Sequence, residues 1–298
     1  MKKVTYLTGF NTFGRDAYAF VATEKGYFRE AGFDVTIQPG TGTVDVLKLV
    51  ASGRADYGVG DFQAGVLTIA NENLPVKAVT AIQDKSLSAI ATVEGYGISS
   101  PADLEGKQIA DQAGSTNQLM FPVYAKAAGV DPSKVTFVPS SPASLPQLLA
   151  SHKVDAIGQF VVAEGLIERA TNGKKAVFLP FSDYLPDLYG TALMTSEKTL
   201  AEKPKEVAAF SAALLKGLKY SLANPEEAGE ILKKHVPTQD AAVAADEIKV
   251  MTPYVGTQNP NGSFSKSRVQ TILDMFSKAN ALNRTVQPSD VAAFTIAE

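Results

Sequence analysis

Five short segments of the chain combine glycine with small polar side chains, and this composition suits the binding of a small molecule. Glycine lets the backbone approach a ligand closely, and the polar side chains supply hydrogen-bond donors and acceptors. The segments are 9–16, 40–43, 58–62, 112–117 and 158–160. The candidate ligand-binding residues are Asn11, Phe13, Arg15, Thr41, Thr43, Asp61, Phe62, Ser115, Thr116, Asn117, Gln159, Phe160 and, further along the chain, Tyr189.

The charged and aromatic members of this set indicate two kinds of ligand. Arg15 could hold a carboxylate or sulfonate through two parallel hydrogen bonds, and Asp61 could accept a hydrogen bond from an amino or amidine group. The four aromatic rings could stack on a flat ring. Each residue also has an ordinary structural interpretation, as a paired or solvated arginine, as part of the core, or as a helix cap in the case of Thr43, Asp61, Ser115 and Thr116.

Alternating strands and helices are predicted to position these segments. The first half shows a β-α-β pattern in which apolar or alternating strands precede helices that end at glycine. Such a pattern is typical of an open, mostly parallel sheet with helices on both faces, and ligands bind such sheets beyond the carboxyl ends of the strands. Strands are predicted at 4–7, 33–37, 55–59 and 75–82, with helices beginning at Asp16, Thr43 and Asp61.

The second half repeats this pattern. Strands are predicted at 87–93, 107–111, 135–138 and 154–157, with one helix capped by Ser115 or Thr116 and another beginning near Pro142. Leu49 to Ser52 and Leu148 to Ser151 are similar at an offset of 99 residues, which also pairs Asp56 with Asp155. The similarity has two explanations, chance likeness of helix-strand units or duplication into two homologous lobes. From residue 198 onward the chain is predicted to be helical and to pack on the first lobe.

Length and composition exclude several classes of function. At 298 residues two domains are expected. The complete lack of cysteine removes disulfides, thiolate catalysis and cysteine-based metal sites. The net charge of -3, with both signs scattered along the chain, argues against a nucleic-acid partner. The start at Met1 leads directly into a strand pattern and is not a signal peptide, so the protein either works in the cytosol or begins behind a cleaved leader.

No pattern in the sequence predicts catalysis or a cofactor. His152 and His235 are far apart and suit structural roles. The chain has no G-x-S-x-G, P-loop, H-E-x-x-H or G-x-G-x-x-G motif. A pair of carboxylates acting as acid and base could be identified only from spatial proximity. We therefore predict a binding protein without catalytic residues, metal or cofactor.

Several segments resemble a solute-binding family named after fungal proteins of thiamine-pyrimidine biosynthesis. Bacterial members bind sulfonates, nitrate, thiamine-pyrimidine precursors, riboflavin or aromatic carboxylates. The pattern K-G-Y-F-x-E-x-G-x-D-V is fairly specific, and the likeness covers nearly the whole chain. The matching segments are 22–35, 52–58, 113–116, 150–156 and the stretch from Tyr189-Gly190 to Lys203-Pro204.

The resemblance implies a two-lobed periplasmic-binding-protein fold of type II. Lobe 1 would comprise residues 1–85 and 195–298, lobe 2 residues 90–190, with hinge crossovers near 83–93 and 189–195. A ligand would be captured in the cleft between the lobes, and the closed form would dock on a membrane permease. The resemblance thus predicts a monomeric, extracytoplasmic solute-binding protein of an ABC importer, periplasmic or membrane-anchored, with its leader removed.

The identity of the ligand stays open between two classes. Residues 189–193 look closest to the branch that binds pyrimidine precursors and riboflavin, which favours a heteroaromatic ring with Asp61 at its amino group, although that branch would be expected to use tryptophan and this chain has none. The alternative is a sulfonate or aromatic carboxylate held by Arg15 and the helix terminus at Ser115 and Thr116.

Two other classes of function share this fold. One is a cytosolic enzyme related to pyrimidine biosynthesis, and the other is a ligand-sensing domain of a larger receptor. The fungal relatives that perform synthesis use a cysteine-rich iron motif and an active-site histidine. This chain has no cysteine and no histidine before position 152, so the resemblance does not extend to that activity.

Overall fold

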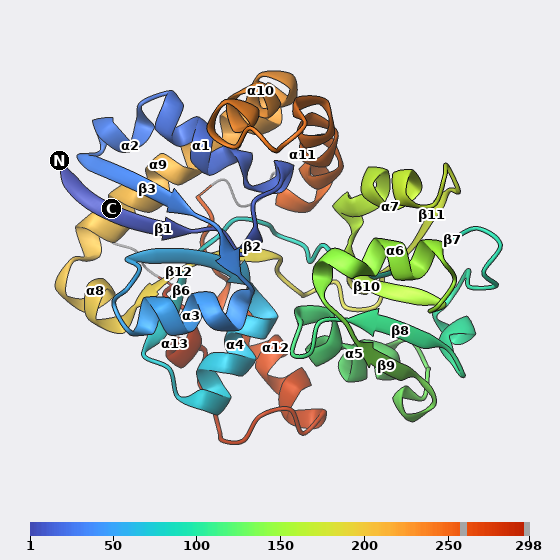
Figure 1. Cartoon of the computed structure of the whole chain (residues 1–298). Coiled ribbons are helices and arrows are strands. Elements are labelled where there is room, and N and C mark those ends of the chain that lie inside the picture. Colours follow the sequence, from blue (N-terminus) through green and yellow to red (C-terminus); the bar gives the residue numbers. More distant parts are fainter. Residues whose placement is uncertain (257–260, 295–298) are drawn as a thin grey trace. The chain divides into compact units, whose positions relative to one another are not determined.

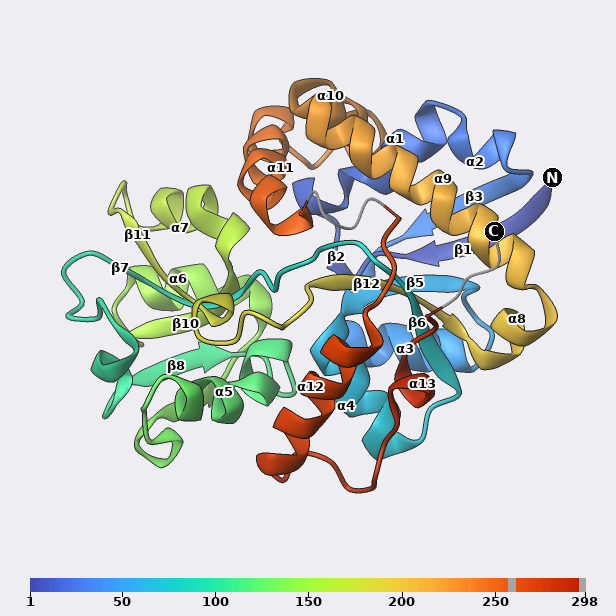
Figure 2. The same cartoon turned by 180° about the vertical axis from the view of Figure 1, so that it is seen from behind.

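The computed structural model describes residues 1–256 and 261–294. It divides into two compact units (Figures 1 and 2). Unit 1 comprises Met1–Asp84 and Tyr189–Glu298, and unit 2 comprises Lys85–Leu188. The helical tail therefore belongs to unit 1, as predicted from the sequence. In the described ranges, no helix combines the length and apolar character needed to cross a membrane.

Unit 1 is built on a five-stranded mixed sheet. Strand β1 pairs in parallel with β3 and β5, whereas β12 runs antiparallel to both β5 and β6. Four strands thus share one direction, which confirms the predicted, mostly parallel sheet. The strand order is β3 (Phe33–Gln38), β1 (Lys2–Leu7), β5 (Tyr57–Asp61), β12 (Thr191–Ser196) and β6 (Val76–Ala81).

Helices cover both faces of this sheet. In Figures 1 and 2, α1, α2 and α9 lie on one face and α3 and α4 on the other. The helices before the crossover are η1 (Gly14–Asp16), α1 (Ala17–Glu24), α2 (Tyr27–Glu30), α3 (Thr43–Ala51) and α4 (Phe62–Glu72). The tail adds α8 (Glu197–Glu202), α9 (Pro204–Ala223), α10 (Pro225–His235), α11 (Ala241–Val255), α12 (Lys266–Lys278) and α13 (Pro288–Val291).

Phe210 of α9 anchors the tail in the core of unit 1. Its ring is fully buried and stacks on Tyr57 of β5 with 4.0 Å between centroids. It also stacks on Phe28 at 4.9 Å and meets the edge of Phe33 at 5.6 Å. Offset-stacked and edge-to-face ring pairs add to the stabilisation that comes from burying apolar area. The tail is therefore part of the core that holds the sheet.

Unit 2 has the same construction. Strand β8 pairs in parallel with β9 and β10, and β7 runs antiparallel to β10 and β11. The strand order is β11 (Ala176–Pro180), β7 (Ser88–Val93), β10 (Ala156–Phe160), β8 (Gln108–Asp111) and β9 (Thr136–Pro139). The helices are η2 (Pro101–Leu104), α5 (Thr116–Ala127), η3 (Pro132–Lys134), η4 (Pro142–Ser144), α6 (Leu145–Ala150), η5 (Val161–Ala163), α7 (Glu164–Ala170) and η6 (Phe181–Asp183).

The two units share a hydrogen-bond motif at the residues that the 99-residue offset pairs. The Asp56 carboxylate accepts from the backbone N–H of Thr5, and the Asp155 carboxylate accepts from that of Gln108, each at 2.8 Å. On the antiparallel strands, Thr195 donates to the Asp56 carbonyl at 2.8 Å and Thr92 to the Asp155 carbonyl at 2.7 Å. Identical contacts at matching places in matching sheets support duplication over chance likeness.

The predicted crossover ranges contain regular strands. The range 83–93 includes β7 in the sheet of unit 2, and the range 189–195 falls mostly in β12 in the sheet of unit 1. Both strands are the antiparallel members of their sheets. The segments between the units are therefore shorter than those ranges, and their action as a hinge stays a prediction.

Candidate functional site

The three candidate segments of unit 1 interlock at the carboxyl edge of its sheet. The short strands β2 (Phe10–Asn11) and β4 (Gly40–Thr41) pair with each other, and the N–H of Gly42 donates to the Gly9 carbonyl at 3.0 Å. The segment after β3 is tied to the end of β5, because the N–H of Asp61 donates to Thr43 Oγ1 at 3.1 Å. The structure thus brings Asn11, Thr41, Thr43 and Asp61 into one connected group.

Thr43 has a different role from the predicted helix cap. Gly42 precedes α3, and Thr43 is the first residue of the helix. Its side chain lies so close to β5 that a Cβ at Gly60 would be 2.7 Å from Thr43 Cγ2, so a larger residue at position 60 would displace the Thr43 side chain. The prediction for Asp61 is confirmed, since Asp61 caps α4 and accepts from the N–H of Ala64 at 3.0 Å.

Arg15 lies among aromatic and acidic groups of unit 1. Its guanidinium carbon is 5.0 Å from the centroid of the Phe13 ring, and Nη2 is 3.5 Å from the Phe10 carbonyl. The N–H of Arg15 faces the Glu247 carboxylate of α11 at 3.4 Å. Arg15 is therefore engaged within the protein, and an anionic ligand would have to compete with a neighbouring carboxylate.

The aromatic candidates differ in burial. Phe62 and Tyr189 are fully buried, and their rings pack against each other and against Phe264. The hydroxyl of Tyr189 accepts from the N–H of Ser265 at 2.9 Å. Phe13 and Phe160 are only half-buried. The structure thus places two of the predicted stacking rings in the core, and Phe13 and Phe160 are the better candidates for stacking on a ligand.

In unit 2, the candidate residues gather where β8 and β10 end. Ser115 caps α5 by accepting from the N–H of Gln118 at 3.0 Å, and its hydroxyl donates to the Asp111 carboxylate at 2.5 Å. Thr116, the other predicted cap, is the first residue of the helix. The amide nitrogen of Asn117 donates to the Gln159 carbonyl at 3.2 Å. This contact joins the start of α5 to the end of β10.

The amide oxygen of Asn117 is the least satisfied polar atom of this group. The residue is 4% exposed, and within the described ranges its Oδ1 accepts no hydrogen bond. Leaving a buried acceptor unpaired costs about 1–3 kcal/mol. A ligand that donates an N–H or O–H to this oxygen would remove that cost.

Two acidic residues beside the candidates, the buried Asp111 and the half-buried Glu247, carry no site prediction from the sequence. Asp111 is the last residue of β8 and approaches β10 so closely that a Cβ at Gly158 would be 2.0 Å from its Oδ2. The sequence does carry a signal for Asp111, because an acidic residue at the end of a strand and before a glycine-containing loop is typical of a binding site. Glu247 approaches the loop after β1 only because α11 packs against η1, and no local pattern in the sequence indicates this contact.

Burial shifts the ionisation of these carboxyl groups. Desolvation raises the pKa of Asp61 to about 7, opposed by backbone hydrogen bonds from Ala64 and Gln63. Desolvation likewise raises the pKa of Glu247 to about 7 and that of Asp16 to about 6, each opposed by Arg15. The pKa of Asp111 is raised to about 6 for the same reason, opposed by the Ser115 hydroxyl.

The stability of the ligand-free protein is expected to fall as the pH rises from about 4 to 8. A carboxyl group whose folded-state pKa is raised binds more protons in the folded chain, so ionisation weakens folding between the two pKa values. Asp61→Asn keeps a good helix cap and removes one such group. The substitution should reduce the loss of unfolding free energy between pH 5 and pH 8 by about 2 kcal/mol. Urea unfolding at both pH values measures this.

The exposed Asp34 provides the matched control for this prediction. Asp34→Asn removes the same charge at the surface and should leave the pH dependence unchanged. An equal effect of both variants would show that net charge, and not the burial of Asp61, causes the dependence.

The two histidines have structural contacts. The ring of His152 stacks on Tyr96 with 3.8 Å between centroids, and His235 Nε2 lies 3.0 Å from a carboxylate oxygen of Glu24. They belong to different units. Within the described ranges, no three or more His, Cys, Asp or Glu side chains lie close enough together to hold a metal ion.

Comparisons with known proteins agree on family and fold. The family model described as NMT1/THI5 like matches residues 16–228. The formylaminopyrimidine-binding protein of Halalkalibacterium halodurans is 26% identical over 91% of this chain and 82% of its own length. The 4-amino-5-hydroxymethyl-2-methylpyrimidine phosphate synthase of Candida albicans is 28% identical over 76% of this chain and 69% of its own.

A solved structure shows the same fold. The alkanesulfonate-binding protein SsuA from Xanthomonas axonopodis pv. citri, bound to MOPS, superimposes with a TM-score of 0.77 at 17% identity, covering 98% of each chain. At this identity the similarity speaks for the type II periplasmic-binding fold, which the sequence analysis predicted, and not for the ligand.

Proposed function

We propose, starting from the fact that this chain belongs to the NMT1/THI5-like family, that it is the solute-binding protein of an ABC-type importer and captures one small organic molecule. The observation that carries the proposal is that each unit has its own group of polar candidates at the same edge of its sheet. In each unit the polar candidates are tied together at the carboxyl edge of the sheet. We further propose that residues of both units contact the same ligand.

We propose a heteroaromatic ring with an amino group as the ligand class. Asp61 and the unpaired Oδ1 of Asn117 are hydrogen-bond acceptors, which suit N–H donors on such a ring. Phe13 and Phe160 could stack on its faces. The similarity to the formylaminopyrimidine-binding protein of H. halodurans supports this class. A thiamine-pyrimidine precursor is the leading candidate.

A sulfonate or aromatic carboxylate is the second ligand class. It would be held by Arg15 and by the N-terminus of α5 at Ser115 and Thr116. The carboxyl groups of Asp16 and Glu247 near Arg15 disfavour it, because they compete for the same positive charge.

The proposed role is binding without chemical conversion, outside the cytoplasm, as a monomer that docks on a membrane permease. A pyrimidine-forming enzyme is a candidate from another class, because the C. albicans synthase is 28% identical. A sensing domain is a third. Incubating the purified protein with candidate heterocycles and following conversion by mass spectrometry separates enzyme from binding protein, since a binding protein returns the ligand unchanged.

A ligand panel is expected to identify one class by thermal stabilisation. Aminopyrimidines, flavins, alkanesulfonates and aromatic carboxylates are compared on the purified protein, with native mass spectrometry to detect a retained molecule. A specific ligand at 100 times its dissociation constant should add about 2.7 kcal/mol to the free energy of unfolding. Stabilisation by sulfonates alone would transfer the proposal to the second ligand class. No stabilisation by any class would contradict the proposed function.

A further inference from the structure

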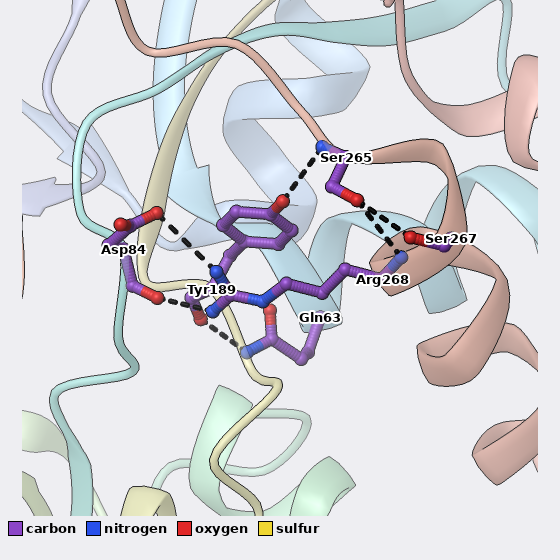
Figure 3. A network of polar contacts seen from close by, with 6 residues as sticks. All are labelled: Gln63, Asp84, Tyr189, Ser265, Ser267 and Arg268. Carbon is purple, nitrogen blue, oxygen red and sulfur yellow. Dashed lines mark hydrogen bonds and ion pairs between the residues drawn. The ribbon is translucent and has the colours of Figure 1, made fainter. Parts of the chain in front are cut away.

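One arginine of the tail contacts both places where the chain passes between the units (Figure 3). Arg268 lies on α12 in unit 1. Its Nη1 is 3.4 Å from Asp84 Oδ1, and its Nη2 donates to the Asp84 carbonyl. The same guanidinium lies 3.7 Å from the centroid of the Tyr189 ring. Asp84 is the last residue of unit 1 before the first crossover, and Tyr189 is the first after the second.

Further hydrogen bonds fix these two residues to unit 1. The N–H of Asp84 donates to the Tyr254 carbonyl at 2.8 Å. On the other crossover, Gln63 donates to the Tyr189 carbonyl, and the Tyr189 hydroxyl accepts from the N–H of Ser265 (Figure 3). The crossovers also join each other, because the N–H of Gly190 donates to the Gln83 carbonyl at 3.0 Å. The Gln83 side chain adds a second link, because its Oε1 accepts from the N–H of Thr191 at 2.9 Å. Arg268 contacts both ends at once.

The next ties along the chain belong to unit 2. The N–H of Ser86 donates to the Leu188 carbonyl at 3.0 Å. The N–H of Ser88 donates to the Ser86 hydroxyl at 3.2 Å. Among the described residues, the exposed Lys85 is the one residue of the first crossover that lies between the ties of the two units. On the second crossover, the ties of the two units are separated by the link from Leu188 to Tyr189.

We propose that Arg268 is a positioning residue that fastens both crossovers to unit 1 and confines the pivot between the units to Lys85 and the Leu188–Tyr189 link. A hinge needs only a few residues that absorb changes in φ and ψ. The guanidinium suits this role because it is planar. It can direct two N–H groups to Asp84 while its face stacks on the Tyr189 ring, and a lysine ammonium cannot make both contacts at the same time.

The inference rests on the proposed function in one respect, since the pivot serves ligand capture. Without Arg268, more residues of each crossover could change their φ and ψ angles. The ligand-free protein would therefore sample more orientations of one unit against the other before it binds. Ordering them would then oppose ligand binding. Arg268→Ala should therefore weaken ligand affinity about three- to tenfold, mainly through faster dissociation.

Amide hydrogen exchange on the ligand-free, full-length chain tests the fastening directly. Arg268→Ala should accelerate exchange about tenfold at the amides of Asp84, Gly190 and Ser265, because the opening of these hydrogen bonds becomes local and easier. Arg268→Lys should give an intermediate acceleration. The matched control is Arg284→Ala, which removes an arginine bonded to the Ala70 carbonyl in the same unit and should leave these amides unchanged.

The following outcomes decide the inference. Acceleration at both crossovers in Arg268→Ala but not in Arg284→Ala, with faster ligand dissociation, supports it. Unchanged exchange at Asp84 and Gly190, or equal acceleration in Arg284→Ala, overturns it, and so does acceleration with unaltered dissociation. If the wild-type protein binds nothing in the ligand panel, the proposed function fails, while the exchange experiment still decides whether Arg268 fastens the crossovers.

Discussion

At pH 8, Asp61→Asn is expected to weaken the binding of an amino-substituted heteroaromatic ligand by about ten- to a hundredfold. Asp61, whose pKa is about 7, is mostly ionised at that pH, and a hydrogen bond to a charged group contributes about 1.5–3 kcal/mol. Arg15→Ala should change the affinity for the same ligand by less than about threefold, since Arg15 is already engaged by neighbouring groups. Asparagine still caps α4, so the fold of unit 1 should persist. Isothermal titration calorimetry of both variants measures the two affinities.

The opposite pattern has an equally clear meaning. A large loss of ligand affinity in Arg15→Ala, together with unchanged affinity in Asp61→Asn, would favour the sulfonate or aromatic-carboxylate class. Asp34→Asn serves as the matched control, because Asp34 is an exposed carboxyl on β3 in the same unit and should have no effect. A similar loss in all three variants would indicate a general electrostatic effect in place of specific recognition.

Phe210→Ala is expected to lower the free energy of unfolding of unit 1 by about 3–5 kcal/mol, the usual cost of truncating a buried phenylalanine. The ring is sandwiched between Tyr57 and Phe28, and its loss would leave a cavity between α9 and the sheet. Native-state hydrogen exchange of amides in β1 and β5 reports the stability of unit 1 separately from that of unit 2.

Phe210→Leu is the control for this prediction. It keeps most of the buried volume and should cost only about 1–1.5 kcal/mol. Amides in β8 and β10 of unit 2 should not respond to either change, since their core contains other residues. A loss below about 1 kcal/mol in Phe210→Ala would contradict the view that the tail is part of the core of unit 1.

Local chemistry explains which parts of the candidate site could be predicted. Asp61 and Ser115 were predicted as helix caps and act as caps, because a cap depends on a residue type and its next three neighbours. Thr43 was predicted as a cap and is not one, since it is the first residue of α3 and its hydroxyl accepts from the N–H of Asp61 at the end of β5. Phe62 resembled Phe13 in the sequence, but packing against Tyr189 and Phe264 buries it.

The sequence by itself determined the two α/β units, their glycine-containing loops, the helical tail and the resemblance to the family. These follow from periodicity, from caps and turns, and from motifs, all of which act over a few residues. Only the tertiary structure decided that β7 and β12 enter the sheets antiparallel, that Glu247 reaches the loop of Arg15, and that Arg268 joins Asp84 to Tyr189. Such contacts join residues more than 60 positions apart, and local sequence patterns do not specify which distant segments meet.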